Sequence, residues 1–235
     1  MPSISYCVAV YWPARKESPG QIAARAEQYF RGLRRIDPVF TGWRLVSEKR
    51  KEANLRVATS RDKLEPFVAA GMHRDYYGAA IPECGFDLWL SILRSDGGSS
   101  MVSIHAGAYS PWLGNNCILY LPPSGRKSSD LLTVNILGNI LREAVISWDA
   151  DWGRVSNWQI HDVLEKPKRK FDVGWLTYIT NRKGPLPKIS GPARVEALDD
   201  RGHVVIATDE RFAADNAIHR RTIRRLNKIL SPILA

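Results

Sequence analysis

Hydrophobic residues recur along the chain with two different periods, and the change between the periods predicts the secondary structure. Apolar residues at helical spacing follow Ser18, and Gln21 three positions later completes the capping box that is typical of a helix N-terminus. We expect this helix to end before Pro38. A long helix is predicted from about Asp130 to Trp148, and its apolar residues cover most of its circumference, which indicates a place in the core.

Short segments rich in β-branched and aromatic residues, separated by turn residues, predict strands. They span residues 4–12, 43–47, 86–93, 101–105, 117–121, 155–160, 173–180, 195–198 and 204–207. Two further helices are predicted, a short one at 62–72 and a terminal one at about 215–232. This order of elements favours an α+β fold, with a largely antiparallel sheet packed with about four helices, in a single domain over residues 1–235.

The amino-acid composition is ordinary for a globular protein, except for the net charge. The 235 residues are 44% hydrophobic and 25% charged, which are ordinary values for a globular domain. The first residues lack the features of a secretory signal peptide, and no window approaches the ~20 apolar residues that a membrane span requires. We therefore expect a cytoplasmic protein without membrane contact. The formal net charge is +10, which favours a polyanion or an acidic protein surface as partner.

The predicted terminal helix carries a cluster of basic residues opposite its apolar stripe. These residues are Arg221, Arg224, Arg225 and Lys228. They could bind nucleic acid phosphates, or they could simply be solvated. The second interpretation is favoured because Phe212 is the only aromatic residue after Tyr178, so side chains that stack on bases are missing. We expect at most weak, non-specific nucleic acid binding, with a Kd of ~10⁻⁴ to 10⁻⁶ M.

The sequence contains no recognisable catalytic motif. Neither a phosphate-binding loop of the G-x-x-x-x-G-K-[ST] type nor a G-x-S-x-G elbow occurs. The five histidines do not fall at metal-ligand spacing with one another. They are His73, His105, His161, His203 and His219. The sequence therefore indicates no enzyme, no cofactor and no metal site.

Two tryptophan-containing segments are candidate binding sites. In the first, Asp149 and Asp151 stand between two tryptophans, the second of which is Trp152. The second segment is the turn that contains Trp112. Tryptophan is enriched at binding hot spots, and two aspartates after a helix C-terminus oppose the helix dipole, which favours a functional role. The alternative is a structural corner anchored by the two indoles, and the residues alone do not decide between the two.

Several motifs, taken in order, resemble the immunity protein 52 family of bacterial polymorphic toxin systems. They are Tyr11-Trp12-Pro13 with Arg15, Glu17 and Ser18; Ile36-Asp37-Pro38 with Phe40 and Trp43; Gly107-Ala108-Tyr109-Ser110-Pro111-Trp112; Trp148-Asp149-Ala150-Asp151-Trp152; Gly174-Trp175-Leu176-Thr177-Tyr178; Pro185-Leu186-Pro187; Asp215-Asn216; and His219. The resemblance extends from about Tyr11 to Leu230. One departure is Ala150, where the family pattern leads us to expect proline.

The resemblance implies a non-enzymatic protein that binds and neutralises a cognate toxin inside the producing cell. The toxin would typically be a restriction-endonuclease-fold nuclease domain, often carried by a type VI secretion effector. At a net charge of +10 the chain cannot act as a uniformly acidic decoy for such a nuclease. Three ways of inhibiting the toxin remain: contact through a local acidic patch, contact with an acidic toxin surface, or binding away from the toxin's active site. A basic nucleic-acid-binding module is the alternative function, and a hydrolytic enzyme ranks third.

Overall fold

The computed structural model describes residues 5–46, 55–93, 98–122, 131–164 and 172–234. Within these ranges nine strands form one antiparallel sheet in the order β2-β3-β4-β5-β1-β6-β7-β9-β8. The strands are β1 (Tyr6–Trp12), β2 (Arg44–Leu45), β3 (Phe86–Leu93), β4 (Ser99–Ala106), β5 (Asn115–Tyr120), β6 (Trp152–Asn157), β7 (Leu176–Thr180), β8 (Arg194–Leu198) and β9 (Gly202–Ile206). The first strand of the chain thus lies at the centre of the sheet, between β5 and β6.

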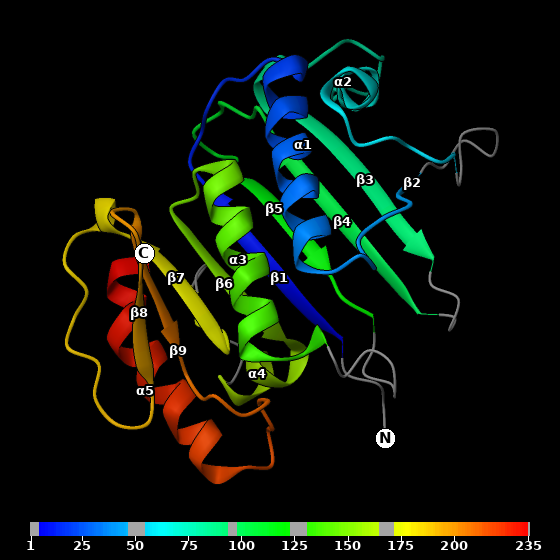
Figure 1. Ribbon diagram of the computed structural model, residues 1–235. Helices are drawn as coiled ribbons and strands as arrows, with labels where there is room; N and C mark the ends of the chain where they lie inside the picture. The colour runs from blue at the N-terminus through cyan, green and yellow to red at the C-terminus, as the bar shows by residue number, and fades with distance from the viewer. Residues whose placement is uncertain (1–4, 47–54, 94–97, 123–130, 165–171, 235) are drawn as a thin grey trace.

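Helices pack onto this sheet, and the predicted α+β architecture is confirmed. They are α1 (Pro19–Ile36), α2 (Arg61–Ala70), α3 (Val134–Trp148), α4 (Trp158–Val163) and α5 (Ala217–Leu234), with the 3₁₀ turns η1 (Pro82–Cys84) and η3 (Asn181–Lys183). Figure 1 shows α1 and α3 lying side by side across one face of the sheet, with α5 near the edge formed by β8 and β9. In the described part of the chain, no helix is both long and apolar enough to cross a membrane.

Local capping explains where α1 begins. The Ser18 side chain accepts a hydrogen bond from the Gln21 backbone N–H at 3.3 Å, and the Gln21 side chain accepts one from the Ser18 N–H at 2.8 Å. These two bonds satisfy N–H groups that the first helical turn leaves without partners. The helix ends at Ile36, and the Asp37 N–H bonds back to the Leu33 carbonyl at 3.1 Å. Both predicted boundaries of this helix are confirmed.

The core helix α3 begins later than its apolar pattern predicts. Thr133 is its N-cap and accepts a hydrogen bond from the Ile136 N–H at 3.3 Å, so the helix starts at Val134. Residue 130, the predicted start, lies outside the described residues. The helix approaches the central strands closely at Gly153, where a β-carbon would lie 3.0 Å from a methyl carbon of Leu141 in α3.

Two further boundaries differ from the prediction because of side-chain caps. The predicted strand at 155–160 is wrong in its second half, since β6 ends at Asn157 and α4 follows directly. The Asn157 side chain caps α4 by accepting a hydrogen bond from the Ile160 N–H at 2.9 Å. In α5, the Asn216 side chain accepts from the N–H groups of Ile218 and His219, and this helix starts at Ala217.

Candidate binding site

A cleft of about 490 Å³ opens at the end of the sheet where β1 finishes and where β5 and β6 begin. The strand register places Tyr11 opposite Trp152 and Trp12 opposite Asn115. The turn that contains Trp112 and the Trp148–Trp152 corner therefore lie on either side of the β1 terminus. The walls are largely apolar, and Asp151 and Lys183 are the charged residues among them. The fold thus brings together the two segments that the sequence singles out separately.

The turn at residues 107–114 is held rigidly by polar contacts beneath it. Asn115 is fully buried, and its side-chain amide donates to the carbonyls of Pro13 (2.8 Å) and Ala108 (3.0 Å) and accepts from the Ala108 N–H (2.9 Å). The N–H groups of residues 109 and 110 both donate to the Glu83 carbonyl at 3.1 Å. Because the backbone is fixed from below, the Trp112 side chain is left 88% exposed above a preorganised loop.

Two tyrosines that the sequence does not single out are also strongly exposed. Tyr76 and Tyr77 are 96% and 91% exposed, and their rings meet edge to face at 5.5 Å. The Asp75 side chain orders their turn by accepting from the N–H groups of residues 77 and 79 at 2.9 and 2.8 Å. Their segment leads into Glu83, the residue that anchors the Trp112 turn. The available sequence signal was the pair of adjacent aromatics inside a turn that ends in glycine.

The two tryptophans of the acidic corner behave differently from Trp112, because both are buried. Trp148 is fully buried and stacks on Trp12, with ring centroids 5.0 Å apart. Trp152 is 5% exposed and stacks on Tyr11 at 4.2 Å. Trp152 is not part of the turn itself but the first residue of β6. Its indole forms a wall of the cleft.

The backbone of the corner turns through Asp149, which adopts the left-handed conformation with φ 48° and ψ 54°. Aspartate tolerates this conformation better than most residues with a side chain. The next residue, Ala150, donates its N–H to the Val145 carbonyl at 3.2 Å. The proline that the family pattern led us to expect at this position could not make this bond, so the departure at Ala150 strengthens the end of α3.

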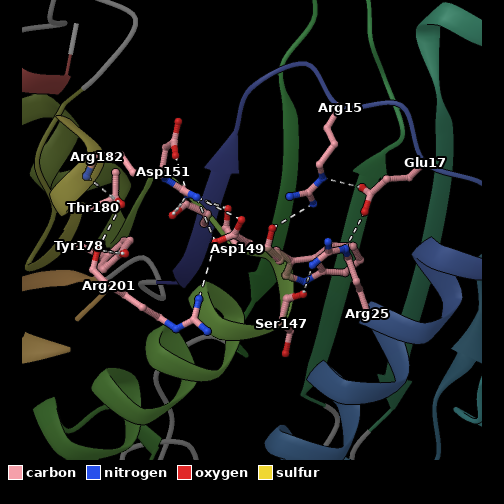
Figure 2. Close-up of polar contacts among 12 residues, drawn as sticks. Arg15, Glu17, Arg25, Ser147, Asp149, Asp151, Tyr178, Thr180, Arg182 and Arg201 are labelled. Atoms are coloured by element: carbon pink, nitrogen blue, oxygen red, sulfur yellow. Dashed lines mark hydrogen bonds and ion pairs between the residues drawn. The ribbon is translucent and has the colours of Figure 1, made fainter. Parts of the chain in front are cut away.

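Arg182 forms ion pairs with both aspartates of the corner (Figure 2). Its guanidinium contacts the Asp149 carboxylate at 3.1 Å and the Asp151 carboxylate at 2.7 Å, and it donates to the Asp149 carbonyl at 3.1 Å. Partial burial lowers the pKa of Arg182, but the hydrogen bonds and charges of the two aspartates outweigh this effect and raise the pKa. The conflict between these aspartates and the dipole of α3 is thereby relieved, so it no longer favours a functional role.

Two further arginines cap the same helix end (Figure 2). Arg15 donates to the Trp148 carbonyl at 3.0 Å, and Arg25 donates to the Ser147 carbonyl at 3.1 Å. Glu17, whose side chain is only 4% exposed, forms ion pairs with both arginines at 3.1 and 2.6 Å. Cations at the C-terminus of a helix interact favourably with its dipole and satisfy its free carbonyls. Arg15 and Glu17, which belong to the first family motif, thus anchor the corner.

The basic residues of α5 are partly engaged with the fold. Arg224 donates to the Val163 carbonyl of α4 at 3.1 Å, and Arg225 donates to the Ser190 carbonyl. Arg221 and Lys228 are exposed. Two of the four cations therefore fasten the helix to neighbouring segments.

Comparison with known proteins agrees with this architecture. The chain is similar to the Pseudomonas aeruginosa T6SS protein PA0821, with a TM-score of 0.59 and 14% sequence identity over 98% of this chain and 76% of the other. A search of curated protein sequences finds no match. The family model described as immunity protein 52 matches residues 4–233. This match covers nearly the whole chain, which therefore belongs to the immunity protein 52 family.

Proposed function

We propose that this protein binds a cognate toxin in the cytoplasm of the producing cell and neutralises it without catalysing a reaction. Membership of the immunity protein 52 family supports the binding of a toxin. The likeness to a type VI secretion (T6SS) protein supports a secreted effector as the source of that toxin. We further propose that the toxin is a nuclease domain of the restriction-endonuclease fold, as the sequence resemblance implies.

The observation that carries the proposal is the exposed Trp112 beside an apolar cleft. An indole that is 88% exposed gains little within the free protein and loses water contact when a partner covers it. Its turn is already fixed by Asn115 and by the Glu83 carbonyl, so little conformational freedom remains to be lost on binding. These are the properties of an interface hot spot. A partner side chain would enter the cleft, whose wall includes the buried Trp152.

The charges around the corner support apolar recognition more than mimicry of nucleic acid phosphates. Asp149 and Asp151 share Arg182, and Arg201 lies 3.6 Å from the Asp149 carboxylate. The two negative charges thus face two positive ones. We propose that both aspartates contact the toxin at the rim of the cleft, where they influence the rate of association, while Trp112 supplies most of the affinity.

Co-expression with the toxin encoded beside this gene tests the proposal. The protein should restore growth, and Trp112→Ala should reduce both the rescue and the affinity measured by calorimetry. Trp158→Ala is the matched control, because Trp158 is 49% exposed on α4 and β6 separates it from the cleft. Failure of the wild-type protein to rescue cells would refute the immunity function.

A separate assay tests the class of toxin. The purified toxin domain should cleave DNA, and one equivalent of this protein should stop the cleavage. If the toxin is neutralised in cells but cleaves no nucleic acid in vitro, the nuclease assignment is wrong and the immunity function stands.

A further inference from the structure

His73, Asp87 and His105 converge at one end of β3 and β4, although they are far apart in the sequence. Asp87 is directly opposite His105 in the register of the two strands, so both side chains project from the same face. His73 follows α2. The Asp87 carboxylate lies 2.8 Å from His105 Nδ1 through one oxygen and 2.9 Å from His73 Nε2 through the other. One potential ligand atom from each residue lies within 4.8 Å of the other two.

The backbone holds this arrangement in place before any ligand binds. The Asp87 N–H donates to the Gly71 carbonyl at 2.9 Å, and the His73 N–H donates to the Gly85 carbonyl at 3.2 Å. Gly71 allows the close approach, because a β-carbon there would lie 1.8 Å from the Asp87 carbonyl oxygen. The segment after α2 is therefore fastened to β3 on both sides of Phe86, the residue before Asp87. Preorganised ligands of this kind are what a metal site requires.

Hydrogen bonding does not fully account for the cluster. His73 Nε2 is covered, yet it makes no hydrogen bond to any described residue, because its ring is not aligned with the Asp87 oxygen 2.9 Å away. A buried nitrogen without a hydrogen bond is costly. The two imidazole rings are nearly perpendicular, at 84°, with centroids 5.3 Å apart. A cation between the two rings and the carboxylate would supply the missing partner for His73 Nε2.

We propose that His73, Asp87 and His105 bind a divalent transition-metal ion of the zinc class. Two imidazoles and one carboxylate suit such ions, whereas Mg²⁺ and Ca²⁺ prefer oxygen ligands alone. The three side chains are 17–38% exposed, so an ion can enter and keep a water molecule in an open position. The ion would also link the end of α2 to β3 and β4. This inference is independent of the proposed toxin binding.

Zinc titration of the chelator-treated full-length protein tests the site. We expect calorimetry to show one Zn²⁺ bound per chain, with at least tenfold weaker binding in His73→Ala and in His105→Ala. His161→Ala is the matched control, because His161 is exposed on α4, and it should bind as the wild type does. Cys84→Ser should also leave the affinity unchanged, which excludes the thiol three residues before Asp87. A hundredfold excess of Mg²⁺ should not compete.

X-ray absorption on the wild-type zinc complex provides a readout that does not depend on the folding of a variant. We expect nitrogen and oxygen ligands at ~2.0–2.1 Å and no sulfur at ~2.3 Å. Three results would overturn the proposal: no zinc binding at millimolar concentration, sulfur in the absorption spectrum, or unchanged affinity in the double variant His73→Gln/His105→Gln.

Discussion

The Trp148–Trp152 corner and the Trp112 turn flank the same cleft and both contain tryptophan, but the tryptophans differ in their surroundings. In the corner, both indoles are buried against aromatic residues of β1, and both aspartates are paired with Arg182. In the turn, polar contacts hold the backbone and the indole of Trp112 is 88% exposed. The indoles and carboxylates of the corner therefore find their partners within the chain. The turn leaves its main hydrophobic group to be covered by a partner.

The elements that each segment connects explain this difference. The corner joins the core helix α3 to β6, a neighbour of the central strand, so any side chain at its ends faces the core. The turn joins β4 to β5, and the buried Asn115 beneath it supplies the stabilising bonds. The large side chains of the turn, those of Tyr109, Trp112 and Leu113, are all exposed, and Trp112 is available for recognition. Tryptophan in a turn therefore says little about binding until its burial is known.

The largest expected effect is on folding stability, from Trp152→Ala. Removing this buried indole deletes its stacking on Tyr11 and leaves a cavity, which should lower the free energy of unfolding by about 3–5 kcal/mol. Trp112→Ala should change it by less than about 0.5 kcal/mol, as expected for an exposed position. Urea denaturation of both variants measures the difference. Equal stability losses would show that the contrast between the corner and the turn is mistaken.

The next effect is on toxin affinity, and it concerns the exposed Trp112 rather than the buried Trp152. Trp112→Ala should weaken toxin binding by about 2 kcal/mol or more, roughly thirtyfold, with an unchanged melting temperature. Trp112→Phe should recover part of the affinity, because a smaller aromatic ring still offers apolar surface to the partner. Calorimetry with the isolated toxin domain, together with thermal melting, gives both quantities. Normal affinity in Trp112→Ala would move the interface away from the cleft.

The comparison also shows which features the sequence could predict. The start of α1 was predictable because Ser18 and Gln21, which define it, lie three residues apart. The boundary between β6 and α4 was not, because apolar residues continue across it and one capping side chain, Asn157, changes the structure. A capping motif of a few residues therefore predicts the boundary of an element only when the apolar pattern also changes at that boundary.

The candidate sites depend on contacts between distant residues, which no local pattern reveals. Arg182 follows Asp149 by 33 residues, and its role arises only when β7 pairs with β6. His73 and His105 meet because α2 is fastened to β3 and β3 pairs with β4. Histidine spacing alone indicated no metal site for this reason. The motif residues could be named from the sequence, but their exposure and partners follow from the sheet register.

A smaller effect is expected from Arg182→Ala. Half-exposed ion pairs contribute little, but this arginine also donates to the carbonyls of Asp149 and Ala150 at the end of α3. We expect a loss of about 1 kcal/mol in the free energy of unfolding, part of which disappears in high salt. Arg182→Lys should keep the salt-dependent stabilisation by the ion pairs and lose the hydrogen bonds to the two carbonyls. A loss in Arg182→Ala that does not depend on salt would mean that the ion pairs of this arginine with Asp149 and Asp151 do not stabilise the corner.

The smallest effect, that of Asp149→Asn, separates the backbone role of Asp149 from its charge when it is compared with Asp149→Ala. Asp149→Asn keeps a residue that tolerates the left-handed conformation and should cost about 0.5 kcal/mol or less, since Asp151 still pairs with Arg182. Asp149→Ala loses the same charge and also places alanine at φ 48°, so it should cost about 1–2 kcal/mol more. Denaturation curves measure this difference in stability. If Asp149 contacts the toxin, both variants should slow association equally, despite their unequal stability. An association rate that falls only in Asp149→Ala would assign this residue to the structure of the corner rather than to recognition.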